Sequence, residues 1–158
     1  MKAAGLMEIK EELTTLPPKK VLELCLRLAK YKKENKELLS YLLFDAHNVQ
    51  IYVESVKKEI DEQFTELPKT NWYFTKKSLR KILRAIGKHS RHTATKESTI
   101  EMLIHFCTKL KTSEINFKKN QSLLNLYNQQ LKKINTLMVS IHEDLHFDYK
   151  KQLEQLNF

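Results

Sequence analysis

The segment Thr75-Lys-Lys-Ser-Leu-Arg-Lys-Ile-Leu-Arg-Ala-Ile-Gly-Lys88 decides the fold class, because its apolar residues recur at intervals of three and four positions. At about 100° per residue, four of them gather on one side of a helix: Leu79, Ile82, Leu83 and Ile86. The same spacing recurs along most of the chain, whereas Gly and Pro number only two and three. Strands and hairpins, which need alternating patterns and turn residues, have little support. We therefore predict an all-α protein.

Helix-breaking residues divide the chain into six to eight expected helices. Pro17 and Pro18 open a helix, Pro68 closes one, and Gly87 is a candidate C-terminal stop. We expect helices near residues 6–14, 18–32, 35–45, 48–66, 75–87 and 96–111, with one or two more between 114 and 156. A chain of 158 residues is long enough for a domain with a core, so a single domain spanning 1–158 is expected.

A partial internal repeat bears on how the helices are arranged. Residues 19–27 match residues 76–84 at five of nine positions. The segment from Lys33 to Asn35 likewise resembles that from Lys96 to Ser98, and Asn and Ser both favour helix N-caps. Repeat units near 18–66 and 75–140 would stack as an α-solenoid, an architecture that resembles HEAT-type proteins in helix arrangement only. The alternative is an irregular helical bundle whose Lys- and Leu-rich helices look alike by composition.

Cysteine usage and hydropathy predict the compartment. Cys25 and Cys107 are far apart and fall on the apolar sides of expected helices, which fits buried thiols in a reducing compartment better than a disulfide. No run of apolar residues is long enough to span a membrane, and the first residues lack the apolar core of a signal peptide. We expect a cytoplasmic protein with no membrane span.

Positive charge is concentrated in one part of the chain, which we call the basic window. Between Leu67 and Lys96 there are nine Lys or Arg residues and no Asp or Glu, whereas the rest of the chain has nineteen of each sign. The formal net charge of +9 therefore belongs to this window. Basic residues in a line along a helix suit an anionic polymer, because each phosphate contact releases condensed counterions. The candidate anion-binding residues are Lys76, Lys77, Arg80, Lys81, Arg84, Lys88 and Arg91.

Three aromatic residues, Trp72, Tyr73 and Phe74, precede this helix directly. Exposed aromatic rings would add stacking surfaces for unpaired bases. Three adjacent rings are also a large apolar area, and we favour the interpretation that they close a helix-to-helix corner in the core. In the loop expected after Gly87, His89 and His92 would add charge to the basic window below about pH 6.5.

A stripe of regularly spaced apolar residues runs through the C-terminal part of the chain. Apolar residues alternate spacings of three and four, which indicates the core face of a long helix more than a seam for a partner. The stripe is Leu124, Tyr127, Leu131, Ile134, Met138, Ile141 and Leu145.

His142 and His146 flank a His-Glu-x-x-His pattern, in which two imidazoles one helical turn apart bind zinc. Only Asp148 and Glu154 follow as carboxylate ligands, and no strand is expected to hold a substrate. A hydrated helix face is the favoured interpretation of this pair. The chain has no glycine-rich phosphate loop, Cys-x-x-Cys pair or serine elbow, so no cofactor and no catalytic residue are predicted.

These features predict a non-enzymatic binding module whose basic helix face engages an anionic partner. Nucleic acid, bound with little sequence selectivity, is the expected partner. The alternative is a protein–protein interaction scaffold of the helical-repeat type, working as a monomer or homodimer. A zinc-dependent hydrolase is a second alternative.

Overall fold

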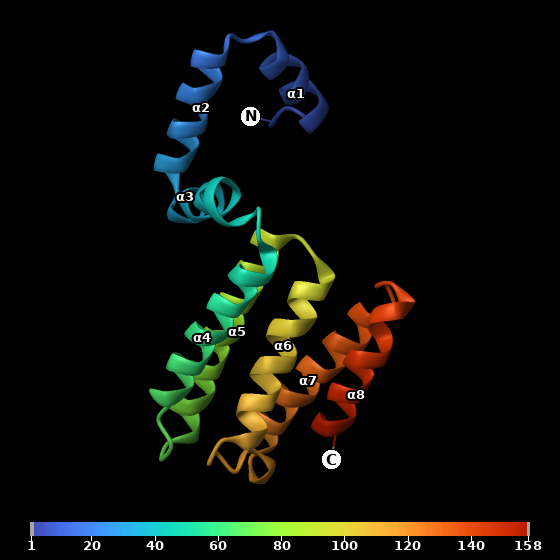
Figure 1. Cartoon of the computed structure of the whole chain (residues 1–158). Helices are drawn as coiled ribbons and strands as arrows, with labels where there is room; N and C mark the ends of the chain where they lie inside the picture. Colours follow the sequence, from blue (N-terminus) through green and yellow to red (C-terminus); the bar gives the residue numbers. More distant parts are fainter. Residues whose placement is uncertain (1, 158) are drawn as a thin grey trace. The chain divides into compact units, whose positions relative to one another are not determined.

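The computed structural model describes residues 2–157, and this part of the chain forms eight α-helices and no strand (Figure 1). The prediction of an all-α protein is confirmed. Short helical segments also occur at Tyr41–Asp45 (η1, a π-helix), Phe117–Lys119 (η2) and Glu143–Leu145 (η3). The α-helices are α1 (Leu6–Thr15), α2 (Pro18–Tyr31), α3 (Lys33–Ser40), α4 (Val49–Thr65), α5 (Trp72–Thr93), α6 (Lys96–Thr112), α7 (Gln121–Met138) and α8 (His146–Leu156).

Contacts between the elements divide the chain into two units, Met1–Phe44 and Asp45–Phe158. The boundary falls inside the first expected repeat unit, 18–66, so the two units do not coincide with the two copies of the sequence repeat. The solenoid and the internal duplication stay predictions. Within the described residues, no helix has both the length and the apolar character needed to cross a membrane.

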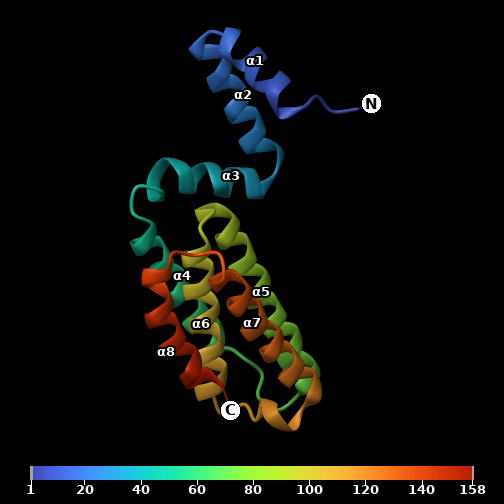
Figure 2. The ribbon, with the colours of Figure 1, turned by 90° about the vertical axis from the view of Figure 1, so that its right-hand side faces the viewer.

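The C-terminal unit is built from two layers of helices around α6. Helices α4, α6 and α8 form one layer, and α5 and α7 form the other (Figures 1 and 2). The core cluster lies wholly in this unit, with Ile82 of α5, Phe106 of α6 and Tyr127 of α7 almost fully buried. The Tyr127 hydroxyl donates a 2.8 Å hydrogen bond to the Leu156 carbonyl, which ties the end of α8 to α7.

Helix α5 is longer than predicted at both ends. The Asn71 side chain accepts the N–H groups of Tyr73 and Phe74, so the helix begins three residues before Thr75. It also continues through Gly87, so the prediction that Gly87 ends it is wrong. The last turns are held by buried residues near Thr93, and the helix ends only at Ala94, whose φ of 53° is left-handed.

Most of the stripe that begins at Leu124 belongs to the core. Tyr127, Leu131, Ile134 and Met138 are buried on α7. The helix then ends at Met138, and a short break separates it from α8. The core-face interpretation is therefore right for the part of the stripe on α7. The expectation that one long helix carries the whole stripe is wrong, because Ile141 lies in the break after α7 and Leu145, in η3, is 37% exposed.

The N-terminal unit comprises α1, α2, α3 and η1, and its helices bury very little. Tyr41 is its one buried residue among those described. The Asn35 side-chain amide donates a 2.8 Å hydrogen bond to the Leu28 carbonyl, joining α3 to α2, so Asn35 does not cap a helix as its sequence context predicted. Cys25 is exposed here, whereas Cys107 is buried in α6, so the expectation of two buried thiols is right for Cys107 alone.

Candidate anion-binding face

The seven predicted anion-binding residues all lie on α5, whose opposite side packs into the core. Leu79, Ile82 and Ile86 are buried on that inner side. Two of the predicted residues, Lys76 and Lys88, are half-buried, and the Lys76 ammonium donates a hydrogen bond to the Ser122 hydroxyl on α7. The other five are exposed, and we call them the α5 stripe: Lys77, Arg80, Lys81, Arg84 and Arg91.

The α5 stripe carries uncompensated charge. None of its five side chains forms a hydrogen bond or ion pair with any other residue that the structure describes. From Lys77 to Arg91 the stripe extends over about 21 Å, because each helical residue rises about 1.5 Å. Positive charges held at fixed intervals along such a line can meet several phosphates at once.

The three aromatic residues extend this stripe, and the prediction that they belong to the core is wrong. Trp72, Tyr73 and Phe74 are 41%, 70% and 52% exposed. The corner between α4 and α5 is instead closed by buried Leu67 and by the Thr75 hydroxyl, which donates a 2.5 Å hydrogen bond to the Pro68 carbonyl. The Asn71 cap starts the helix early enough to place the three rings in its first turn, facing outward.

Tyr73 and Phe74 lie on the same side of α5 as the basic residues. Tyr73 is four residues and Phe74 three residues before Lys77, so both are one turn from it on a helix. Their rings contact each other edge to face, with 5.4 Å between centroids. The structure therefore joins a pair of exposed rings to the N-terminal end of the α5 stripe.

Helix α7, which shares a layer with α5, also lacks carboxylates. Residues 115–142 contain four lysines and no Asp or Glu. All four are exposed: Lys118, Lys119, Lys132 and Lys133. We did not predict this second carboxylate-free segment, although a charge count along the sequence would have found it.

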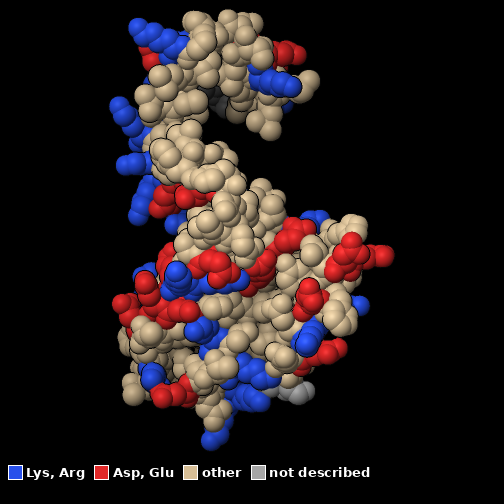
Figure 3. Space-filling model, viewed as in Figure 1, with Lys and Arg blue, Asp and Glu red and all other residues tan. Residues whose placement is uncertain are grey.

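The other layer of the C-terminal unit has a different charge pattern. Helices α4, α6 and α8 carry eight Asp or Glu residues together with lysines, and Figure 3 shows both signs intermixed on this face. Helices α5 and α7 carry nine Lys or Arg residues and no carboxylate. Among these helices the carboxylates are thus confined to the α4–α6–α8 layer, whereas basic residues occur in both layers, and the charged residues of α5 and α7 are all Lys or Arg.

His89 and His92 do not extend the α5 stripe. The loop expected around them is the last part of α5, and both side chains pack against α4. The Tyr52 hydroxyl lies 2.7 Å from His89 Nδ1 and 3.0 Å from His92 Nδ1. These imidazoles therefore join α5 to α4.

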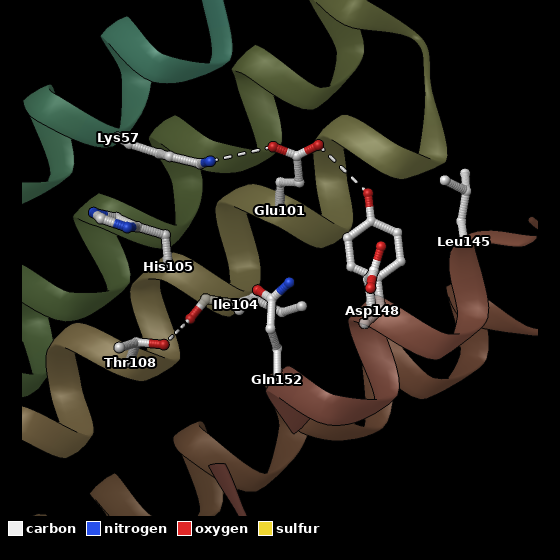
Figure 4. Close-up of a pocket in the computed structure, with 9 residues that line it drawn as sticks. Lys57, Glu101, Ile104, His105, Thr108, Leu145, Asp148 and Gln152 are labelled. Atoms are coloured by element: carbon white, nitrogen blue, oxygen red, sulfur yellow. Dashed lines mark hydrogen bonds and ion pairs between the residues drawn. The ribbon is translucent and has the colours of Figure 1, made fainter. Parts of the chain in front are cut away.

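A polar pocket of about 340 Å³ lies between α4, α6 and α8 (Figure 4). Glu101 is at its centre: one oxygen lies 3.2 Å from the Lys57 ammonium, and the other accepts a 3.4 Å hydrogen bond from the Tyr149 hydroxyl. Burial lowers the pKa of Lys57, but its hydrogen bonds to Glu54 and Glu101 outweigh burial and raise that pKa above its ordinary value. Burial raises the pKa of Tyr149 to about 12. The central groups therefore satisfy one another, and their evident effect is to join three helices.

His142 and His146 do not share a helix face. His142 precedes η3 and accepts the Asp144 N–H, whereas His146 is the first residue of α8 and its Nε2 lies 3.2 Å from the Ile141 carbonyl oxygen. Each imidazole is thus engaged by nearby backbone. Across residues 2–157, no group of three or more His, Cys, Asp or Glu side chains is placed to hold a metal ion.

Comparison of the chain with models of protein families, with curated proteins and with solved structures gives no significant match.

Proposed function

We propose that this protein is a non-enzymatic module that binds nucleic acid through the α5 stripe, with little sequence selectivity. The observation that carries the proposal is the segregation of charge: every carboxylate on the α-helices of the C-terminal unit lies outside the α5–α7 layer. Five unpaired basic side chains on that layer contribute an attraction that no neighbouring carboxylate cancels. Such a surface attracts polyanions and contacts their backbone, which carries no sequence information.

The exposed rings favour single-stranded over double-stranded nucleic acid. Unpaired bases can stack on Tyr73 and Phe74, and each engaged base contributes about 1–3 kcal/mol. The bases of a duplex are already stacked and offer no free face. We therefore expect single-stranded oligonucleotides to bind more tightly than a duplex of equal length.

Salt dependence gives a quantitative test. For single strands, the logarithm of the binding constant falls by about 0.7 per phosphate contact for each tenfold rise in salt. If each residue of the α5 stripe contacts one phosphate, the total slope is about −3.5. Fluorescence anisotropy with a labelled single-stranded oligonucleotide at several salt concentrations measures this slope.

A matched pair of variants separates the α5 stripe from net charge. We expect Lys77→Glu/Lys81→Glu/Arg84→Glu to abolish binding without loss of helicity, because all three side chains are exposed. The control Lys58→Glu/Lys150→Glu/Lys151→Glu changes the net charge equally on the other layer, also at exposed positions. Equal affinity of the two variants would refute the proposal.

A further inference from the structure

Helix α1 presents an apolar side that packs into no core. Leu6, Ile9 and Leu13 lie on one side of it, at spacings of three and four residues, and Leu6 is 86% exposed. No residue of α1 is buried. Glu12 borders one flank of this apolar side and Lys10 borders the other. Glu8 lies farther round the helix, where it accepts a 2.7 Å hydrogen bond from the Gly5 N–H, and with three Glu and one Lys the helix is net negative. Helix α1 is therefore an amphipathic, acidic helix with an open binding face.

A groove of the opposite charge lies between α2 and α3 of the same unit. It has a volume of about 550 Å³, and its apolar part includes Leu26, Leu39 and Leu43. No Asp or Glu lines it. Figure 3 shows a broad uncharged area on this unit, with Lys and Arg gathered mainly along one side and a few Asp and Glu side chains at its margins. The lysines that line the groove are Lys30, Lys32, Lys33 and Lys36.

The two features are complementary in both apolarity and charge. An amphipathic helix binds an apolar groove through residues at the spacing of Leu6, Ile9 and Leu13. The net negative charge of α1 also matches the lysines that line the groove, and such complementarity favours this partner over a basic one.

The α1 of the same chain does not make this contact in the structure, since none of its residues lines the groove. Only Leu16 and Pro17 join α1 to α2, both in extended conformation, and proline fixes its own φ. Lys30 is twelve residues along α2 from Pro18, or about 18 Å at 1.5 Å per residue. Glu12 lies only about one turn from the end of α1, so this carboxylate remains far from Lys30.

We propose that two copies of this chain associate reciprocally, each placing its α1 in the α2–α3 groove of the other. The contact is isologous, so one two-fold arrangement fills both grooves and covers both α1 helices. It uses residues of the N-terminal unit alone and does not depend on nucleic-acid binding.

Complementary charge reversal tests the proposal. We expect wild-type protein to show a concentration-dependent dimer by sedimentation velocity. The variant Glu8→Lys/Glu12→Lys puts lysines on α1 opposite the lysines of the groove. The variant Lys30→Glu/Lys36→Glu puts glutamates in the groove opposite the glutamates of α1. Either variant alone should raise the dimer dissociation constant about a hundredfold, because like charges across an interface cost several kcal/mol.

An equimolar mixture of the two variants should dimerise again. In the mixed dimer one α1 carries lysines into a groove with glutamates, and the other carries glutamates into a groove with lysines. Recovery of the dimer also shows that both variants are folded. The control Lys150→Glu/Lys151→Glu, on α8, should dimerise like the wild type.

Three results would overturn the proposal. One is wild-type protein that stays monomeric at hundreds of micromolar. A second is a mixture of the two variants that stays monomeric although the wild type dimerises. The third is monomeric protein that cosediments with phosphatidylserine vesicles and loses this on Lys30→Glu/Lys36→Glu, since the groove would then serve a lipid surface.

Discussion

The two units of this chain share a helical composition but differ in what their apolar side chains do. Among the described residues, the C-terminal unit buries twenty-six apolar side chains, whereas the N-terminal unit buries only Tyr41. The N-terminal unit also leaves twelve large apolar side chains exposed along 44 residues, against seven in the much longer C-terminal unit.

This contrast shows that amphipathic helices alone do not make a core. Helix α2 is strongly amphipathic and packs mainly on α3 within its unit, yet none of its residues is buried. Helix α6 is surrounded by α4, α5, α7 and α8 and buries side chains on most of its surface. The N-terminal unit therefore has an apolar surface that a second protein surface would cover, while the C-terminal unit is complete by itself.

The largest difference we expect between the units is in thiol reactivity. Cys25 is exposed on α2, whereas Cys107 is fully buried and burial raises its pKa to about 12. Modification of Cys107 requires opening of the core, so Cys25 should react at least about a thousandfold faster with iodoacetamide at pH 8. Mass spectrometry of a time course, with Cys25→Ser as the control, measures both rates. Comparable rates would show that the C-terminal core opens easily and would break the comparison.

The two units should also differ, by a smaller amount, in the stability lost when one leucine is shortened to alanine. Leu103 is 1% exposed in α6 and Leu28 is 61% exposed in α2. We expect Leu103→Ala to lower the free energy of unfolding by about 2–5 kcal/mol, because it removes buried contacts and leaves a cavity. Leu28→Ala should change it by no more than about 0.5 kcal/mol in dilute monomer. Urea unfolding followed by circular dichroism measures both, and a large loss from Leu28→Ala would show that α2 has packing partners.

Sequence periodicity predicts the helices well because each depends on its own residues. The expected and observed limits agree within two residues for α1, α2, α4 and α6. The helix expected at 35–45 is instead α3 (Lys33–Ser40) followed by η1, and the two ends of α5 differ most. Asn71 starts it and buried residues near Thr93 extend it past Gly87, and the second effect depends on packing against other helices.

The candidate site shows the same division between local and tertiary information. The exposed basic side of α5 follows from spacing alone, so five of the seven predicted residues lie on an open surface. Whether Trp72, Tyr73 and Phe74 face inward depends on which other residues fill the corner between α4 and α5. Leu67 and Thr75 fill that corner, so the three rings face outward. That the two carboxylate-free helices, α5 and α7, lie in the same layer could not be predicted from the sequence of either helix alone.

The smallest effect we expect is on how the stability of each unit falls at low pH, where ion pairs lose their carboxylate charge. In the C-terminal unit, Asp61 of α4 accepts hydrogen bonds from His105 (2.6 Å) and Lys109 (3.1 Å) of α6. The ion pairs Lys20–Glu23 and Lys33–Glu37 of the N-terminal unit each lie within one helix. Burial raises the pKa of Asp61, but its bonds to His105 and Lys109 outweigh burial and hold that pKa below its ordinary value of 3.8.

A lowered pKa means that the folded state binds the proton less readily than the unfolded state. The stability that Asp61 contributes is thus complete above pH 3.8 and is lost as the pH falls below that value through the folded-state pKa. Unfolding in urea at pH 2 to 6 should show a shallower acid-dependent loss for Asp61→Asn than for the wild type. The effect is small because Asp61 is 40% exposed and solvent weakens the pair. Glu23→Gln, in a pair within one exposed helix, should leave the profile unchanged, and a similar change in both variants would remove this distinction between the units.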